Sequence, residues 1–262
     1  MSGLVDIHAH LLPGIDDGPP TLEESLEMAR VAVDSGISTI AATPHLRSDF
    51  PGVRIEEIGP RCQSLQEALN HAGIPLRVVP GGEVSLVWAL EASDEELRLA
   101  SYGQRGTDLL IETPNDVSML DQLLFPIRAK GFRITLGHPE RSAAFQRDPS
   151  RVERLVEQGV LLQVNGRALM GRRSSSAALA EHLCREGFAH LIASDGHRAA
   201  EWRPITDLAA GFEVLTGLVG VERARWMAAE VPATIATGAA LPPPPAIEAP
   251  RRARRWRRLF TS

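Results

Sequence analysis

Residues 4–17, LVDIHAHLLPGIDD, join a short apolar run to two histidines and then to an aspartate pair. The run predicts a buried strand, on which His8 and His10 stand two residues apart. Side chains two apart on a strand point to the same side, so both rings can bind one metal ion. The aspartates precede a glycine, a pattern typical of a turn. The stretch therefore indicates a strand that delivers potential metal ligands to the loop after it.

Short apolar runs of this kind recur between longer amphipathic segments. The candidate strands are residues 4–7, 37–43, 76–81, 108–112, 133–137, 160–165 and 190–194. The candidate helices are residues 21–36, 61–72, 117–131, 150–158, 175–186 and 205–218. In the first of these helices Thr21 and Glu24 have the spacing of a capping box, Gly36 is the stop signal, and the expected apolar stripe is Leu22, Leu26, Ala29 and Val33.

The alternation of strands and helices predicts an α/β protein. Near-continuous hydrophobic strands suit a parallel sheet that is buried on both faces. Seven successive units favour a closed or nearly closed barrel over a doubly wound sheet.

Side chains with metal-binding chemistry follow six of the seven candidate strands, and the sixth strand offers Asn165 instead. In chain order they are His8, His10, Asp17, His45, Glu83, Glu112, His138, Asp195 and His197. Any one of them has an ordinary explanation as a turn former or a hydrogen-bonding group. In a β/α barrel, however, the carboxyl ends of the strands converge on the face that carries the active site, so all nine would meet there. His71, His182 and His190 lie elsewhere and are interpreted as ordinary residues.

Nine donors, four of them carboxylates, are too many for one ion. Nitrogen and carboxylate ligands without thiolate suit Mn, Fe or Zn, and the ligand type alone does not choose among them. Two or three divalent ions would fit if a carboxylate bridges. Three such ions would leave an excess charge of about +2, which suits a phosphate dianion, and clustered ions assist phosphoryl transfer. Arg141 and Arg203 lie beside metal motifs and can bind phosphate in a bidentate manner, and Arg47 is a weaker candidate for the same role.

The segments DIHAHLLPGIDDGP, TPH, GGEV, GHPER, QVNG and SDGHR occur in this order between residues 4 and 236. The set resembles the PHP (polymerase and histidinol phosphatase) superfamily. More narrowly, it is similar to the bacterial tyrosine-protein phosphatases of capsule and exopolysaccharide gene clusters, the CpsB/YwqE-like family. The resemblance implies a distorted (β/α)7 barrel with a trinuclear centre, most often manganese. It also implies a substrate, phosphotyrosine on a partner tyrosine kinase of the polysaccharide co-polymerase type.

The resemblance also implies roles for the nine donors. His8, His10, Glu83 and Asp195 would hold one ion, and Glu83 would bridge to a second ion held by His45, Glu112 and His138. Asp17 and His197 would hold the third. Asp17, Arg141 and Arg203 are then the candidate catalytic residues, the two arginines as phosphate ligands. Two departures bear on substrate preference: Ser142 stands where the family pattern has an aromatic residue, and Arg198 follows His197 where an asparagine is more usual.

Three alternatives remain to be weighed. A small-molecule phosphoesterase, such as a histidinol-phosphate hydrolase, would share these metals, although no long insertion that might enclose a small substrate is visible. An amidohydrolase also begins with His-x-His, but many use a strand-end lysine, and the one lysine here, Lys130, falls on a candidate helix. A non-catalytic, metal-stabilised docking module is the third alternative. Its signature would be missing ligands, and none of the expected ligands is missing.

The composition fits one large globular domain of residues 1–240, since 44% of the 262 residues are hydrophobic. We find neither a signal peptide nor a membrane-spanning run, so we expect a cytoplasmic protein, and nothing predicts nucleic acid binding. Cys62 and Cys184 lack the arginine of a Cys-x5-Arg phosphatase loop and are expected to be buried, unreactive thiols.

Residues 241–262 differ from the rest, with a proline-rich linker followed by RRARRWRR at 251–258. These six arginines belong to the 28 basic residues, and the remaining 22 face 33 acidic ones, so that the body carries −11. Residues beyond Leu241 lack the apolar spacing for core packing, and we expect a flexible tail. The tail is either a solubilising end or an electrostatic tether to anionic lipid at the inner membrane face or to an acidic partner.

Overall fold

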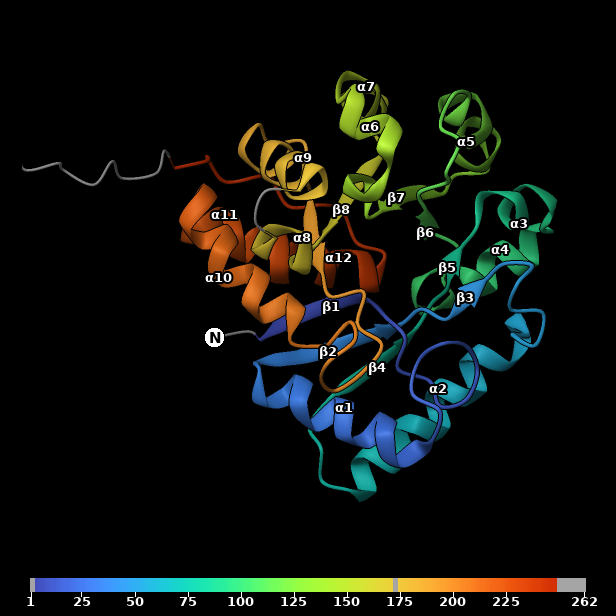
Figure 1. Ribbon diagram of the computed structural model, residues 1–262. Coiled ribbons are helices and arrows are strands. Elements are labelled where there is room, and N and C mark those ends of the chain that lie inside the picture. The colour runs from blue at the N-terminus through green and yellow to red at the C-terminus, as the bar shows by residue number, and fades with distance from the viewer. Residues whose placement is uncertain (1–2, 172–173, 249–262) are drawn as a thin grey trace, which may run out of the picture.

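The computed structural model describes residues 3–171 and 174–248 and contains nine parallel strands in that part of the chain (Figure 1). They are β1 (Leu4–Ala9), β2 (Ile37–Ala42), β3 (His45–Leu46), β4 (Arg77–Pro80), β5 (Glu83–Val84), β6 (Asp108–Glu112), β7 (Arg133–Gly137), β8 (Leu161–Asn165) and β9 (Leu191–Ala193). All seven strands predicted from the sequence are present. The two additional strands, β3 and β5, are short.

The strands form two sheets that together make one circuit. One sheet has the order β1-β2-β4 and the other the order β3-β5-β6-β7-β8-β9. Two chain segments run through both sheets, because β3 follows β2 and β5 follows β4 after breaks at Thr43-Pro44 and Gly81-Gly82. Backbone hydrogen bonds continue across these breaks, from Glu83 to Pro44 at 3.1 Å among others. Proline has no amide hydrogen and glycine packs poorly in a strand, so both breaks have a local cause.

The circuit closes between the last strand and the first. Asp195 donates its backbone amide to the carbonyl of His8 at 2.9 Å, and His10 donates to that of Gly196 at 2.8 Å. With each interrupted strand counted once, the structure is a distorted (β/α)7 barrel, as predicted. The barrel is distorted at the two strand interruptions and at the junction between β9 and β1.

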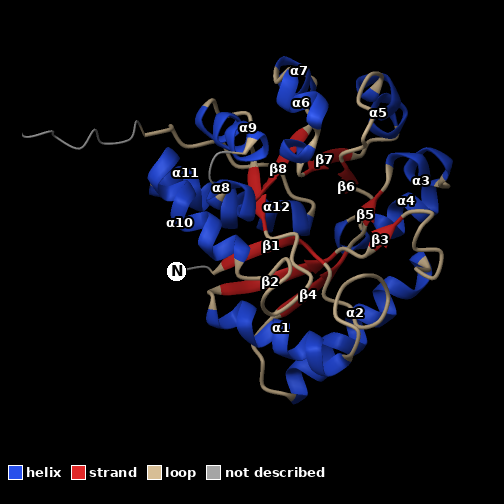
Figure 2. Cartoon of the chain, viewed as in Figure 1, coloured by secondary structure: helices blue, strands red, loops and turns tan. Residues whose placement is uncertain are grey.

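Helices surround the barrel, as Figure 2 shows in blue around the central red strands. They are α1 (Leu22–Asp34), α2 (Ile55–His71), α3 (Leu86–Glu91), α4 (Asp94–Ala100), α5 (Leu120–Ala129), α6 (Ala143–Arg147), α7 (Ser150–Glu157), α8 (Gly166–Met170), α9 (Ser175–Arg185), α10 (Asp207–Val219), α11 (Val221–Arg225) and α12 (Val231–Thr237). A π-helical turn at Trp226–Glu230 joins α11 to α12. Within the described residues, none of these helices has the length and apolarity that crossing a bilayer requires.

Two helix predictions need correction. The fully buried face of α1 consists of Ser25, Met28, Ala29 and Ala32. Leu26 and Val33 of the predicted stripe are partly buried against the core, so the stripe was wrong only at Leu22. The small side chains of this face let the helix lie close to the sheet, and Leu22 at its start is left 39% exposed. Helix α2 begins at Ile55, six residues earlier than predicted, and contains Pro60. Pro60 is the sixth residue of α2, where a proline removes one i→i−4 hydrogen bond, yet the helix continues through it, so Pro60 did not mark the boundary.

The segment that follows α12 packs against the barrel, contrary to the expectation that nothing beyond Leu241 does so. Ile247 contacts the hydrophobic core. The Trp226 indole donates to the carbonyl of Pro242 at 3.1 Å, and Glu248 donates its amide to Val219 at 3.0 Å. The sequence signal was weak because a single apolar side chain and backbone groups make these contacts. The arginine run at 251–258 lies outside the described residues.

Candidate metal centre

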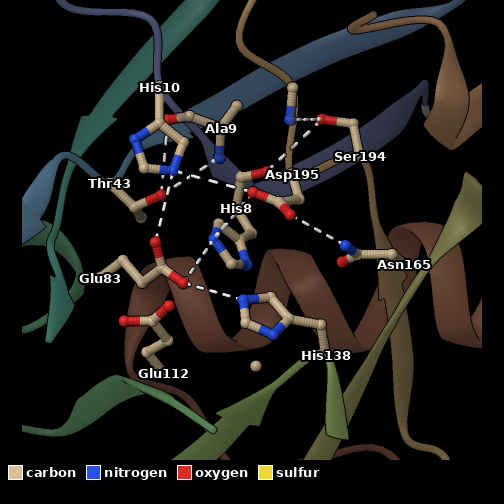
Figure 3. A network of polar contacts seen from close by, with 12 residues as sticks. His8, Ala9, His10, Thr43, Glu83, Glu112, His138, Asn165, Ser194 and Asp195 are labelled. Carbon is tan, nitrogen blue, oxygen red and sulfur yellow. Dashed lines mark hydrogen bonds and ion pairs between the residues drawn. The ribbon is translucent and has the colours of Figure 1, made fainter. Parts of the chain in front are cut away.

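All nine predicted donors meet at the carboxyl ends of the strands, at one end of the barrel. Their ligand atoms fall into four overlapping groups, in each of which the atoms lie within 4.8 Å of one another. The groups are His10–Asp17–His45–His197, His8–Glu83–His138, His8–His10–Asp195 and His45–Glu83–Glu112. The family resemblance implied a somewhat different division: here His45 also joins Asp17 and His197, and His138 lies with His8. Figure 3 shows the side chains around Glu83 pointing toward one another.

Glu83, at the start of β5, lies at the centre of the cluster and contacts four of its histidines. Its Oε1 atom lies 2.9 Å from His138 Nε2 and 3.3 Å from His8 Nε2. Its Oε2 atom lies 2.8 Å from His45 Nδ1 and 3.4 Å from His10 Nε2. The side chain is 1% exposed. A carboxylate with each oxygen directed at a different pair of imidazoles has the arrangement of a bridging ligand.

A chain of hydrogen bonds fixes the orientation of His8. Its Nδ1 atom lies 2.8 Å from Gln163 Oε1, the Gln163 amide donates to Asn165 Oδ1 at 2.8 Å, and Asn165 donates to Asp195 Oδ2 at 2.9 Å. Because the Gln163 oxygen can only accept, His8 carries its proton on Nδ1 and turns the Nε2 lone pair toward the cluster. Figure 3 shows the last link of this chain, Asn165 beside Asp195.

His10 is oriented in the same way by Asp16, the neighbour of the predicted ligand Asp17. Asp16 Oδ2 lies 2.6 Å from His10 Nδ1 and also accepts the backbone amide of His45 at 3.1 Å. Asp17 instead faces the cluster, with Oδ1 3.2 Å from His197 Nε2 and 3.5 Å from His45 Nε2. Asp16 therefore orients the His10 ring, whereas Asp17 is itself a candidate metal ligand.

The sequence interpretation missed Asp16 and Gln163. Asp16 looked like a turn residue because the aspartate pair precedes a glycine. Gln163 lies inside a strand in which all five residues are buried. An uncharged polar side chain within such an apolar run was the available signal, since buried amides need partners.

Arg141 and Arg203, the two predicted phosphate ligands, lie on either side of Asp195, whereas Arg47 does not join them. The Nη1 atoms of Arg141 and Arg203 lie 3.4 Å and 3.5 Å from the carboxylate of Asp195, and Arg203 Nη1 is also 3.1 Å from His197 Nε2. Arg47 binds Glu112, with Nη1 3.0 Å and 2.9 Å from its two oxygens, and also pairs with Asp49. Its position suits the orientation of Glu112 better than phosphate binding.

The electrostatics of the cluster favour cations. Burial by itself would lower the pKa of His8, but Glu83 and Asp195 outweigh it and raise that pKa to about 8. Burial would likewise raise the pKa of Glu83, yet the surrounding histidines hold it well below the usual range. The carboxylates that draw protons to these rings would draw divalent cations in the same way.

The residues present fit metal ions. His8 Nε2, His10 Nε2, Asp17 Oδ1 and Glu83 Oε2 are buried atoms with no hydrogen-bond partner. Buried polar atoms without a partner are costly and uncommon in folded proteins. These four converge in the groups described above, and nitrogen with carboxylate oxygen is a donor set for Mn, Fe or Zn.

Three residues at the site have left-handed backbones. His138 has φ of 39°, Asp195 of 54° and Arg203 of 48°. This conformation is uncommon outside glycine and costs free energy, so the surrounding structure must hold it in place. All three lie at the cluster or donate to it, which is where such strain is usually found.

The two thiols take no part in the site. Cys62 and Cys184 are free and buried, as predicted, and burial raises the pKa of each to about 12. A thiol with that pKa is scarcely ionised at neutral pH and is a poor nucleophile.

A (β/α)7 barrel with a buried cluster of histidines and carboxylates at its mouth is the architecture of a metal-dependent hydrolase. Within that class, the chain belongs to the CpsB/CapC family of capsular polysaccharide synthesis, whose model matches residues 4–236.

Comparison with individual proteins agrees with this membership. The chain is 33% identical to the tyrosine-protein phosphatase YwqE of Bacillus subtilis (strain 168), over 74% of this chain and 77% of YwqE. It is 25% identical to the tyrosine-protein phosphatase CpsB of Streptococcus agalactiae serotype V, over 84% of this chain and 93% of CpsB. It also superposes with a TM-score of 0.79 and 29% identity on a crystal structure from a study of YwqE from Bacillus subtilis and CpsB from Streptococcus pneumoniae, described as unique metal-dependent tyrosine phosphatases. That match covers 94% of this chain and 100% of the other.

Proposed function

We propose that this chain is a metal-dependent phosphomonoesterase that removes phosphate from tyrosine residues of a partner bacterial tyrosine kinase and so regulates capsule or exopolysaccharide synthesis. The observation that carries the proposal is the position of Glu83 between four histidines, with Asp195 beside it flanked by two arginines. Family membership and the phosphatase activity named for the relatives support the same reaction.

The cluster would hold two to three divalent ions, with Mn favoured and Fe or Zn as alternatives. We propose that Glu83 is the bridging ligand, and that Asp195 and Glu112 supply negative charge on either side of it. When bound, the ions supply the charge that phosphoryl transfer requires and lower the pKa of water at the site. His8 and His10 present Nε2 to them because Gln163 and Asp16 engage their other ring nitrogens.

Arg141 and Arg203 would bind the non-bridging oxygens of the phosphate. Their guanidinium groups are already within 3.5 Å of Asp195, so little rearrangement separates them from a phosphate bound beside it. Hydrolysis of a phosphotyrosine needs no dedicated proton donor to the leaving group. A phenolate leaves without one because tyrosine has a pKa of about 10, whereas a serine alkoxide does not. The site therefore suits phosphate monoesters of tyrosine better than those of serine.

The remaining proposals concern the place of action. We propose that residues 1–240 are the catalytic unit, that it works in the cytoplasm, and that the kinase partner is of the polysaccharide co-polymerase type. The arginine run at 251–258 would hold the enzyme near anionic lipid or an acidic segment of the partner, since each arginine contributes on the order of 1 kcal/mol near such a surface.

The test is the rate of hydrolysis of a phosphotyrosine peptide, a phosphoserine peptide of otherwise identical sequence, and histidinol phosphate, each with Mn and with a chelator. We expect turnover of the phosphotyrosine peptide to exceed that of the phosphoserine peptide at least tenfold and to require metal. Equal rates on both peptides, or a preference for histidinol phosphate, would instead identify a general or small-molecule phosphoesterase.

A further inference from the structure

A pocket of about 390 Å³ opens beside the metal cluster, on the side of Asp195. Arg141, Arg203 and Asp195 line it. Arg167 of α8 and Ser174, the residue before α9, line it as well. A phosphate ester bound between the two arginines would therefore extend its organic part into this pocket.

Among the described residues that line the pocket, Trp202 is the one aromatic side chain. It is 51% exposed, which is unusual for so large an apolar group unless a ligand or partner covers it. Its ring packs edge-on against His197 with centroids 4.9 Å apart, so it stands directly beside the cluster.

The backbone holds Trp202 on a tight loop. His197 donates its amide to the carbonyl of Arg203 at 2.8 Å, and Ile205 donates to Arg198 at 2.9 Å. Glu201 and Arg203, on either side of Trp202, both have positive φ, 67° and 48°. A loop pinned at both ends presents the ring in a fixed place, which lowers the entropic cost of stacking against it.

The guanidinium groups around the ring support the same role. Arg203 lies 5.2 Å and Arg198 5.7 Å from the ring centroid. Trp202 is thus packed against Arg203, the candidate phosphate ligand, while about half of its surface remains exposed and the residue lines the pocket. Ser142, where the family pattern has an aromatic residue, caps α6 by accepting the amide of Phe145 at 3.4 Å. Trp202 is accordingly the aromatic surface that the described lining of this pocket offers to a substrate ring.

We propose that Trp202 is a specificity-determining residue that stacks on the phenyl ring of the substrate and makes the pocket selective for aryl over alkyl phosphates. The inference rests on the proposed phosphatase function and adds an aromatic subsite to it. Its chemistry is that of offset or edge-to-face ring contact, which adds to the simple burial of apolar area.

The test is the pair of inhibition constants for phenylphosphonate and methylphosphonate, which share the anionic head and differ in the ring. The metal-loaded full chain is compared with Trp202→Ala, Trp202→Phe and the control Phe125→Ala, which removes another exposed aromatic side chain on α5. We expect Trp202→Ala to weaken phenylphosphonate about five- to tenfold and leave methylphosphonate nearly unchanged. Trp202→Phe should restore most of the preference, and Phe125→Ala should behave as the unaltered chain.

An unchanged preference in Trp202→Ala would overturn the proposal. So would an equal loss of both inhibitors, because that would show that Trp202 acts only by positioning Arg203. The proposed function fails separately, if the unaltered chain does not hydrolyse the phosphotyrosine peptide although the ring preference depends on Trp202.

Discussion

Asp16 Oδ2 lies 2.6 Å from His10 Nδ1, and the same oxygen accepts the backbone amide of His45 at 3.1 Å. One carboxylate thereby sets the ring of one candidate ligand and the backbone of another. Carboxylates in this position behind a metal-bound histidine hold the ring orientation and raise its basicity.

Replacement of Asp16 by Asn should weaken metal binding about 10- to 100-fold while the fold is retained. The amide can accept from one partner but lacks the charge that stabilises the ring. Metal affinity measured by calorimetric titration checks this, with Asp34→Asn, an exposed carboxylate at the end of α1 and outside the four ligand groups, as the control. Equal affinities in Asp16→Asn and the unaltered chain would show that the contact plays no part in metal binding.

Replacement of Arg141 or Arg203 by Ala should raise the inhibition constant of inorganic phosphate about tenfold or more and lower kcat/KM, since charged hydrogen bonds to phosphate are lost. Metal content should stay full, because neither residue belongs to a ligand group. Arg61→Ala on α2, whose ion pair with Glu57 is exposed, is the control. Unaltered phosphate inhibition in both variants would identify the two arginines as surface charges.

His190 should make the fold sensitive to mild acid. Burial, with a contribution from Arg223, lowers its pKa to about 4 from 6.5, and its Nδ1 accepts the amide of Leu162 at 3.2 Å. The unfolded chain therefore binds a proton more readily than the folded one. The low pKa of His190 in the folded chain therefore makes the free energy of unfolding depend on pH. The contribution of neutral His190 is complete above pH 6.5, and the free energy of unfolding falls by on the order of 2–3 kcal/mol as the pH decreases toward 4.

Urea unfolding at pH 7.5 and pH 4.5 measures this effect. The variant His190→Asn keeps an acceptor for Leu162 but does not titrate, so it should lose less stability between the two pH values than the unaltered chain. The same loss in both would assign the acid sensitivity to other groups.

The segment 242–248 should contribute measurably to stability. Truncation after Leu241 removes Ile247 from the core and the carbonyl bonded to Trp226, whereas truncation after Glu248 keeps both. The shorter chain should be less stable than the longer by about 1–3 kcal/mol, seen as a melting temperature several degrees lower. Identical melting curves for the two truncations would mean that these contacts are dispensable.

The strands and the candidate ligands that follow them could be predicted because the apolar runs mark the strands and the ligands stand directly after the strand ends. Apolar runs mark the parallel strands, and a barrel brings their carboxyl ends together, so His8, Glu83 and Asp195 could be grouped across the whole chain. Contacts that depend on exact side-chain direction could not. The sequence does not distinguish Asp16 from Asp17, although one faces a ring nitrogen and the other the cluster.

Arg47 shows the same limit. Its place after the second strand was compatible with phosphate binding, and only the structure brings it to Glu112, 65 residues away. Helices α3 and α4 were not predicted because they are only six and seven residues long. Helices so short take their stability from tertiary packing more than from local sequence.

The central claim is that Glu83 bridges metal ions, and elemental analysis together with hydrolysis of a phosphotyrosine peptide tests it most directly. The unaltered chain, Glu83→Gln and the surface control Glu67→Gln are purified, loaded with Mn, freed of unbound metal and compared. We predict two to three ions per chain and full activity for the unaltered chain and the control. Glu83→Gln should hold fewer ions and show no measurable phosphatase activity while remaining folded, because one substitution removes charge from two sites. A Glu83→Gln variant with full metal content and a near-normal rate would contradict the account.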